Sequence, residues 1–431
     1  MKDKWILPPG EERKGARPKE RARPRRGSRH GRASVPAAVL ALWVALCLPG
    51  PLAAAPQEKP GAGGETPPVV VVSSLDADML AAAAEAVRGK EPAVQFRSYP
   101  DESRLLSLVR SGGLVPDVYF GTTTVFLSRL AGRGFLAPRT PSFADRLPVG
   151  LADRERRWYT VLGDALAVVY NSEYYAEPEL KKYLPKRWSD LGRPRYRGSL
   201  LLEYPTPYNA VGYLFACLVD RAERREGDRR RGFSLLEGYD RNLYRADGKT
   251  PSFRARGDLL TRRGLFSGGD GSITAASLRE VERAAAEGLP VDFIQPEEGL
   301  VLHPRGLAIR RDAPPRAQRV YDILADEAFL VRFARRHACV PVAAGGEFTV
   351  SLWPGEPASF EIMETDHDAV LRNLDGWLGE WQSLYKGRTL RKLHLLDDAL
   401  NTTMIFLVPA AILFLIYRST RRSRRSRRPA P

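Results

Sequence analysis

Short apolar runs alternate with amphipathic stretches along the chain from residue 69 onward. Apolar runs of four to eight residues that end in turn formers are typical of buried strands in a parallel sheet, and apolar positions three and four apart are typical of helices. The predicted strands are Val69–Val72, Ala93–Tyr99 and Val115–Phe120, and the helices that follow them are Asp76–Arg88, Ser103–Ser111 and Val125–Arg133. This alternation predicts an α/β fold with a doubly wound sheet.

The longest strand-like stretch is Trp158–Asn171, with the sequence WYTVLGDALAVVYN. Taken alone, it predicts one more core strand, and the alternative is a strand that joins two lobes. The later predicted strands are Tyr196–Leu202 and Gly306–Ile309, and the later helices are Ala210–Val219, Ile273–Glu287, Ala317–Ala334 and Asp366–Leu384.

Both ends of the chain combine an apolar run with a basic flank. Val35–Leu48 follows a basic stretch and precedes small residues, which predicts a secretory signal over 1–55, with an uncleaved anchor as the alternative. Residues 56–68 are rich in Pro and Gly, which indicates a linker. Ala399–Tyr417 holds 19 residues without a charge, about 28 Å as a helix, followed by the basic tail 418–431. It predicts a transmembrane helix with a cytoplasmic tail, and a buried soluble helix is the alternative.

The net charge of +16 is concentrated at the two ends. Residues 1–34 carry twelve Lys and Arg against four acids, and residues 418–431 carry seven Arg and no acid. The remainder is close to neutral, with 48 basic and 47 acidic residues. A basic nucleic-acid-binding face is therefore not expected on the folded part.

The residues that commonly carry catalysis are scattered along the chain. No Cys or His cluster has metal-ligand spacing, and Gly268–Ser272 lacks the Lys of a phosphate-binding loop. No Ser-His-Asp set is visible. We therefore expect neither an enzyme nor a cofactor. Once the signal is removed, Cys217 and Cys339 remain, either paired as a disulfide or as two buried thiols.

Small and hydroxyl-bearing residues follow several of the predicted strands. Ser73, Ser74, Gly121 and Thr122 end two strands, and each pair precedes a helix, where free backbone N–H groups favour an anion. Capping of those helices is the alternative role for the hydroxyl groups. Tyr208–Asn209 and Gly271–Ser272 stand at similar turns.

The order of these segments resembles the type 2 periplasmic solute-binding proteins of ABC importers, nearest their ferric-ion-binding branch. The segments that carry the resemblance are VVVVSS, PDVYFGTT, VVYNS, RWSDLGRPRYRGSLLLEYP, GLPVDFIQPEEG and the closing Val340–Val342. The likeness spans about residues 69–384. It implies a two-lobed fold with two crossing hinge strands and a ligand held between the lobes.

The resemblance also implies boundaries and a site. The crossings would be Trp158–Asn171 and Val291–Gly299, lobe one would be 69–164 plus 300–395, and lobe two would be 165–299. The implied ligand-binding residues are Ser73, Ser74, Gly121, Thr122, Asp164, Tyr170, Tyr208, Asn209, Gly271, Ser272 and Glu298. The strand-end hydroxyls suit a small anion or a metal chelated by one. Glu297 and Glu298 would instead favour a cation, and solvated or salt-bridged carboxylates at the hinge are the alternative.

One departure concerns the ligand itself. Family members that bind ferric ion use adjacent tyrosines late in the second lobe, where this chain has Leu265–Asp270 and no tyrosine pair. The resulting prediction is a solute-binding subunit of an ABC importer, with a single-pass anchor in the inner membrane and its soluble part in the periplasm or outside the cell. Its partners would be a small-molecule or metal-chelate ligand and an ABC permease. The alternative is a sensor or adapter with the same fold.

Overall fold

The computed structural model describes residues 67–244, 259–260, 272–344, 349–351 and 357–385. The predicted signal, the transmembrane segment Ala399–Tyr417 and the basic tail therefore lie outside the described residues, together with most of the predicted linker. Among the helices that are described, none is both long and apolar enough to cross a membrane.

The predicted strand-helix alternation is confirmed at the N-terminal end. The elements there are β1 (Val69–Ser73), α2 (Ala77–Arg88), β2 (Val94–Ser98), α3 (Glu102–Arg110), β3 (Val118–Thr123) and α4 (Thr124–Ala131). The third strand runs further than the apolar pattern indicated, since Gly121, Thr122 and Thr123 continue it in fully buried positions. Asp101 and Thr123 cap the helices α3 and α4 by accepting hydrogen bonds from backbone N–H groups.

The middle of the chain contains the longest strand. Its elements are β4 (Leu136–Ala137), η1 (Ala144–Arg146), β5 (Trp158–Asn171), α5 (Pro178–Lys181), η2 (Trp188–Gly192), η3 (Pro194–Tyr196), β6 (Leu200–Leu201), α6 (Ala210–Glu226) and α7 (Arg229–Asn242). The remaining elements are β7 (Ile273–Ser277), α9 (Leu278–Ala286), β8 (Val291–Ile294), β9 (Val301–Arg310), α10 (Pro315–Leu324), α11 (Glu327–Arg336), η4 (Val342–Ala344), β10 (Thr349–Ser351), β11 (Pro357–Ser359) and α12 (His367–Tyr385).

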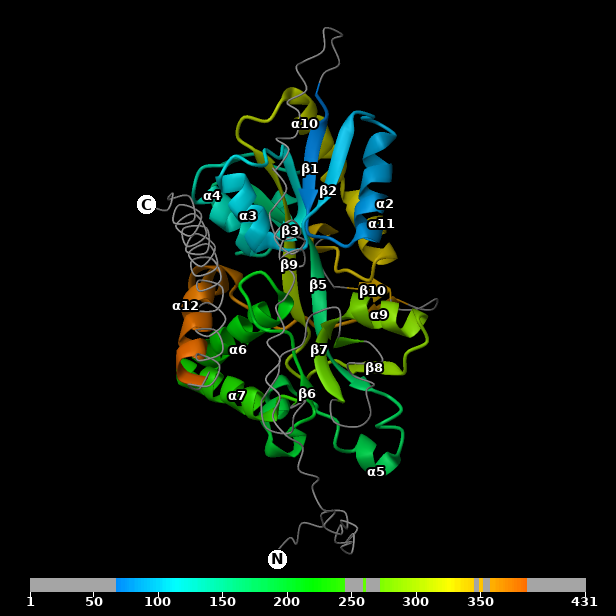
Figure 1. Cartoon of the computed structure of the whole chain (residues 1–431), viewed down its shortest axis with the longest axis vertical. Helices are drawn as coiled ribbons and strands as arrows, with labels where there is room; N and C mark the ends of the chain where they lie inside the picture. The colour runs from blue at the N-terminus through cyan, green and yellow to red at the C-terminus, as the bar shows by residue number, and fades with distance from the viewer. Residues whose placement is uncertain (1–66, 245–258, 261–271, 345–348, 352–356, 386–431) are drawn as a thin grey trace, which may run out of the picture. The chain divides into compact units, whose positions relative to one another are not determined.

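One sheet runs through both lobes, in the order β2-β1-β3-β9-β5-β7-β6. The pairs β1–β2, β1–β3 and β6–β7 are parallel, whereas β9 and β5 are antiparallel to each other and to their other neighbours. The strands β5 and β9 stay paired from Trp158 opposite Ala308 to Leu166 opposite Val301, and they connect the upper and lower parts of the fold in Figure 1. Trp158–Asn171 is thus a strand that joins two lobes.

The predicted second crossing, Val291–Gly299, is wrong. The strand β8 in that segment pairs with the far end of β5, from Val168 to Asn171, and stays within lobe two. The chain then turns at Gly299, whose φ of 94° is in the left-handed region, and β9 makes the second crossing.

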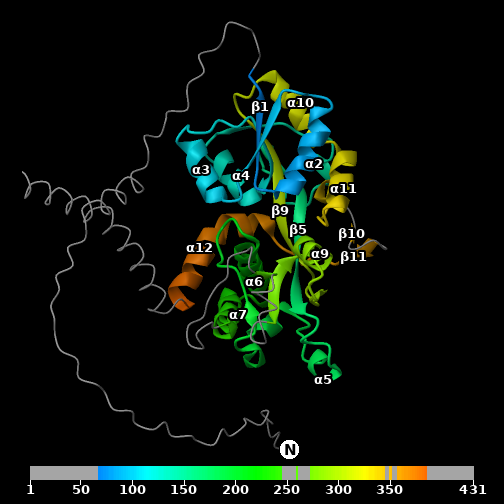
Figure 2. The same ribbon diagram turned by 45° about the vertical axis from the view of Figure 1, so that its right-hand side comes forward.

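Each lobe packs helices on both faces of its part of the sheet. In lobe one, α2, α10 and α11 cover the face that presents Val71 and Phe120, and α3 and α4 cover the face that presents Val72 and Tyr119. In lobe two, α6 and α7 cover one face and α9 covers the other. Figures 1 and 2 show the two sets of helices around the shared strands β5 and β9.

The assignment of all of 300–395 to lobe one is wrong for its last helix. The residues Val370, Leu374, Trp377, Leu378 and Trp381 form the apolar face of α12 and belong to the same buried cluster as α6. The periodicity correctly predicted an amphipathic helix here, but the partner of its apolar face is lobe two.

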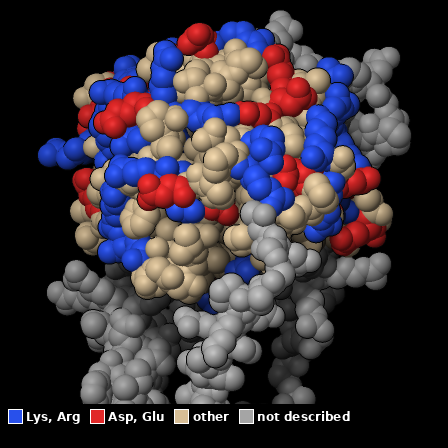
Figure 3. All heavy atoms as spheres, turned by 90° about the horizontal axis from the view of Figure 1, so that it is seen from above, with Lys and Arg blue, Asp and Glu red and all other residues tan. Residues whose placement is uncertain are grey.

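The surface of lobe one mixes the two signs of charge. Figure 3 shows Lys and Arg interspersed with Asp and Glu over the end of the molecule that it displays. Ion pairs within lobe one include Arg139–Asp322 and Arg146–Glu327.

Candidate functional site

A cleft of about 850 Å³ lies between the two lobes. Residues 100–103, which run into the first turn of α3, line it from lobe one. Residues 203–211, except Pro205, line it from lobe two, in the connection from β6 into the first turn of α6, together with Ala275–Ser277 of β7. Asp164 of β5 and His303 and Arg305 of β9 also line the cleft, so both crossing strands contribute to it.

A buried ion pair joins the two crossing strands at the cleft. The Nε atom of Arg305 lies 2.6 Å from Oδ2 of Asp164, and the two side chains are 7% and 6% exposed. The same guanidinium donates to the hydroxyl of Ser74 at 3.0 Å and to the carbonyl oxygen of Gly121 at 3.2 Å. Arg305 therefore ties the hinge to the carboxyl ends of β1 and β3 in lobe one.

The network continues from Ser74 to a second buried carboxylate. The hydroxyl of Ser74 donates to Oε1 of Glu102 at 2.6 Å, and that carboxylate also accepts from the backbone N–H and the hydroxyl of Thr123. Burial raises the pKa of Glu102, although the hydrogen bonds from Ser74 and Thr123 act in the opposite direction. The strand-end hydroxyl groups of Ser74 and Thr123 thus donate hydrogen bonds to a carboxylate of the protein.

The loop between β6 and α6 forms the lobe-two wall. Asn209 caps α6 by accepting from the N–H of Gly212 at 2.9 Å, and it holds the loop by donating to the carbonyl oxygen of Tyr204 at 2.6 Å. Tyr208 accepts a hydrogen bond from Arg129 of lobe one, whose guanidinium lies 4.6 Å from the centre of the tyrosine ring. This wall therefore touches lobe one directly.

Among the described residues, the side chains around the cleft are acidic on balance. Five carboxylates of this described part line it, from Asp101, Glu102, Asp164, Glu203 and Glu280, against one guanidinium, that of Arg305. Tyr204, Thr206, Tyr208 and Asn209 add phenol, hydroxyl and amide oxygens. An oxygen-rich lining with this charge suits a cation or a hydrogen-bond donor better than a simple anion.

The structure brings together only part of the predicted binding set. Asp164, Tyr208 and Asn209 line the cleft. Ser74 and Gly121 contact its buried network, whereas Ser73 accepts from the N–H of Leu75 inside lobe one and Thr122 is fully buried within β3. Gly271 lies outside the described residues.

Two predicted residues lie elsewhere in lobe two. The hydroxyl of Tyr170 donates to Asp292 of β8 at 2.7 Å, and the hydroxyl of Ser272 is 3.3 Å from that of Tyr175. Tyr170 is the next-to-last residue of β5, and Ser272 directly precedes β7. The prediction that Tyr170 lies at the cleft is not matched, because β5 continues well past the hinge.

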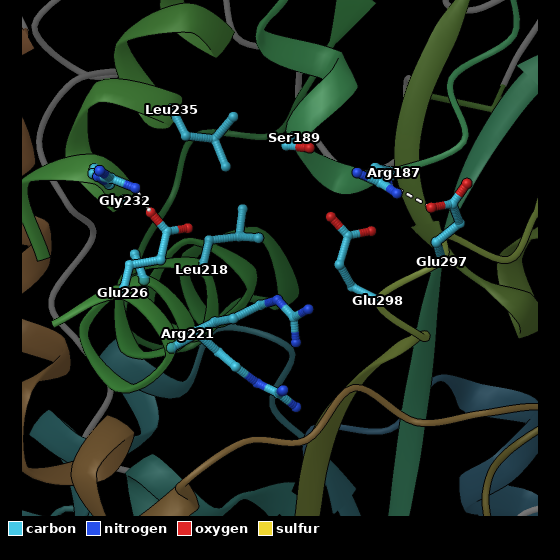
Figure 4. Close-up of a pocket in the computed structure, with 12 residues that line it drawn as sticks. Arg187, Ser189, Leu218, Arg221, Glu226, Gly232, Leu235, Glu297 and Glu298 are labelled. Carbon is cyan, nitrogen blue, oxygen red and sulfur yellow. Dashed lines mark hydrogen bonds and ion pairs between the residues drawn. The ribbon is translucent and has the colours of Figure 1, made fainter. Parts of the chain in front are cut away.

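Glu298 lies at a separate pocket of about 480 Å³ in lobe two. One of its carboxylate oxygens accepts from the N–H of Trp188 at 3.1 Å, and the neighbouring Glu297 pairs with Arg187 at 2.5 Å. Figure 4 shows Arg187, Glu297 and Glu298 lining this pocket together with Arg221 of α6. Glu298 thus helps to hold the turn after β8 against η2, away from the interlobe cleft.

Several cleft residues were missed from the sequence. Arg305 follows His303 and Pro304 in an otherwise apolar strand, and a charge in such a run was the available signal. Glu102 and Glu280 stand in the first turns of α3 and α9, where acidic residues are common for reasons unrelated to a ligand.

Both described cysteines, Cys217 and Cys339, are buried free thiols.

The described residues contain no group of three or more His, Cys, Asp or Glu side chains placed to hold a metal ion. Leu265–Asp270, the segment where the resemblance would place a tyrosine pair, lies outside those residues.

A sequence model described as bacterial extracellular solute-binding protein matches residues 114–358 of the chain. No curated protein sequence matches it.

Several solved structures share the fold at low sequence identity. The Trichodesmium protein IdiA (FutA), in complex with iron and citrate, has a TM-score of 0.56 and 18% identity, covering 73% of this chain and 98% of that one. Iron-bound HitA from Pseudomonas aeruginosa has a TM-score of 0.56 and 17% identity, covering 73% and 99%. AfuA from Actinobacillus pleuropneumoniae, with fructose 6-phosphate bound, has a TM-score of 0.55 and 15% identity, covering 75% and 100%.

Proposed function

Because the chain belongs to the family of bacterial extracellular solute-binding proteins, we propose that it is the ligand-capturing subunit of an ABC importer. Members of this family are non-enzymatic transport components. The partner in this proposal is a permease in the cytoplasmic membrane, and the ligand is a small solute held between the lobes.

The observation that carries the proposal is the cleft at the hinge. Residues 100–103 of lobe one and residues 203–211 of lobe two face the same cavity, and β5 and β9 connect the two lobes beside it. Bending of this two-stranded connection would bring the two loops together around a ligand without separating the paired strands. Hinge closure of this kind gives a binding protein two shapes that a partner can distinguish.

The lining supports a hard metal cation, carried as a chelate, as the ligand. Carboxylate and phenol oxygens such as those of Glu203 and Tyr204 are ligands that hard cations prefer, and the chelator would complete the coordination. Two of the structures with the same fold were solved with iron, one of them together with citrate. The simple-anion alternative has less support, since the Ser74 hydroxyl and the Arg305 guanidinium are already engaged with Glu102 and Asp164.

We further propose that the C-terminal segment tethers the protein to the membrane. The support is Ala399–Tyr417, which has no charged residue, and the seven arginines that follow it within residues 418–431. A basic flank of this kind remains on the cytoplasmic side, so the binding lobes would face the opposite side.

The experiment is calorimetric titration of the purified full-length chain with ferric citrate, citrate alone and inorganic phosphate. We expect saturable binding of ferric citrate with a Kd of about 1 μM or tighter, and markedly weaker binding of the other two. Glu203→Gln should weaken binding, whereas Glu297→Gln, at the separate pocket of lobe two, should leave the Kd unchanged. Tighter binding of phosphate, or an unchanged Kd in Glu203→Gln, would contradict the ligand assignment.

Uptake separates the importer from a sensor with the same fold. Deletion of an importer subunit should abolish accumulation of labelled iron supplied as ferric citrate, and expression of the full chain should restore it. Unchanged accumulation after deletion, together with intact binding in vitro, would favour the sensor or adapter.

A further inference from the structure

The last described helix contacts both lobes. Its buried face packs on α6 in lobe two through Leu374, Trp377 and Trp381. Leu371, on the same helix, packs against the cores of both lobe one and lobe two, and Tyr208 does the same from the cleft wall. Figure 2 shows α12 reaching from α6 and α7 to the level of α4.

A bidentate ion pair joins this helix to lobe one. The Nη2 atom of Arg129, on α4, lies 2.6 and 2.7 Å from the two carboxylate oxygens of Asp375. The Nη1 atom of the same arginine donates a hydrogen bond to the hydroxyl of Tyr208. One lobe-one guanidinium is thereby shared between the cleft wall and the last described helix.

The surroundings give this contact more weight than an ordinary surface pair. The Arg129 side chain is 27% exposed, while Asp375 is 67% exposed, so solvent and salt reach the acid. The guanidinium also lies over the ring of Tyr208, which is itself partly buried against the cores of both lobes. These contacts can form only while α4 is close to α12 and to the loop that holds Tyr208.

We propose that Arg129, Tyr208 and Asp375 form an interlobe clasp, in which Arg129 positions Tyr208 at the cleft and sets how firmly the lobes close on the ligand. The proposal rests on the function proposed above. Tyr208 then couples ligand binding to lobe closure, because it lines the cleft and its hydroxyl accepts a hydrogen bond from Arg129 of lobe one.

The chain provides a matched control for this ion pair. Arg139 and Asp322 also form a bidentate pair, with side chains 29% and 57% exposed, but both residues are in lobe one. Removing that pair changes charge and hydrogen bonding to a similar extent without touching the connection between lobes.

The test measures the distance between the lobes in the full-length chain without added ligand. Spin labels are placed at Val115→Cys in lobe one and Tyr183→Cys in lobe two, whose side chains are exposed. In Asp375→Asn we expect a longer or broader distance distribution, and in Asp322→Asn the wild-type distribution. The double substitution Arg129→Asp with Asp375→Arg rebuilds the ion pair but not the contact with Tyr208. It should therefore give a shorter and narrower distance distribution than Arg129→Asp alone, which a purely local defect would not allow.

Titration with ferric citrate then connects the clasp to affinity. Loss of a partly exposed ion pair should raise the Kd about two- to fivefold in Asp375→Asn and leave it unchanged in Asp322→Asn. Identical distance distributions in wild type and Asp375→Asn, or in Arg129→Asp and the charge-exchanged pair, would overturn the clasp. If the variants differ in distance but no chain binds ferric citrate, the clasp stands and the proposed ligand fails.

Discussion

Asp164→Asn should be among the most damaging single substitutions of a polar side chain in this protein. The carboxylate of Asp164 is 6% exposed and accepts from the Nε of Arg305 at 2.6 Å. An asparagine has nearly the same shape, so the substitution removes the charge while creating almost no cavity. Arg305 would keep its hydrogen bonds to Ser74 and Gly121 but would lose its only charged partner on the adjacent strand.

The expected loss in the free energy of unfolding follows from the burial of the Asp164–Arg305 pair. Removing one partner of a buried ion pair leaves the other charge uncompensated and costs about 3–5 kcal/mol, whereas an exposed pair contributes about 0–1 kcal/mol. We therefore expect Asp164→Asn to lower the free energy of unfolding by about 3 kcal/mol. Asp322→Asn, at an acid that is 57% exposed, should lower it by less than about 1 kcal/mol.

Urea unfolding followed by tryptophan fluorescence measures both variants, since the chain has seven Trp residues. A difference of less than about 1 kcal/mol between Asp164→Asn and Asp322→Asn would refute the reasoning, because the hinge pair would then behave like a surface pair. The combined substitution Asp164→Asn with Arg305→Met should cost less than the sum of the two single changes, as expected for directly coupled charges.

Three further predictions test other parts of the fold. Burial lowers the pKa of His367 to about 4. The free energy of unfolding should therefore decrease as pH falls from about 6.5 to about 4, by up to about 3 kcal/mol, and His367→Gln should flatten this pH dependence in thermal melts. Gly212→Ala places a Cβ within 1.9 Å of a backbone oxygen of the cleft loop and should cost about 1–3 kcal/mol, whereas Gly376→Ala, with open space around it, should be neutral or stabilising; equal melting temperatures for the two would contradict this. Cys217 and Cys339 should resist iodoacetamide in the native chain and react after unfolding, because burial raises the pKa of both thiols; rapid labelling of the native protein would show that these sites open.

Local patterning predicted the sheet elements whose residues are uniformly apolar. Val69–Ser73 and Trp158–Asn171 are buried on both faces, so their sequences are apolar almost throughout and stand out. The apolar pattern predicted only Gly306–Ile309 of β9, because His303, Pro304 and Arg305 interrupt the run, and the second crossing at Val291–Gly299 was implied by the family resemblance instead. Arg305 is tolerated in β9 because its partner, Asp164, is supplied by a strand far away in sequence.

The site was less predictable than the fold for a related reason. Its acidic character comes from Asp101, Glu203 and Glu280, which belong to three separate connections or helix starts and meet only after both lobes have formed. The lobe on which α12 packs was also not predictable, because the spacing of its apolar residues predicts a buried face but does not say which lobe covers it.

The interleaved order of the sheet also determines when each lobe can be completed during synthesis. In lobe one, β3 borders β9, with Val118 opposite Ile309. The N-terminal strands therefore emerge long before their central neighbour exists, and all of lobe two except α12 is made in between. A chain that crosses a membrane from its N-terminus would expose the unpaired edge of β3 throughout that interval. Because the β3–β9 pairing is non-local, we expect it to form slowly, and the exposed edge would need protection against aggregation until then. Truncation after residue 299 should accordingly leave both lobes unable to fold, even though it removes neither the first three strands nor the wall formed by residues 203–211.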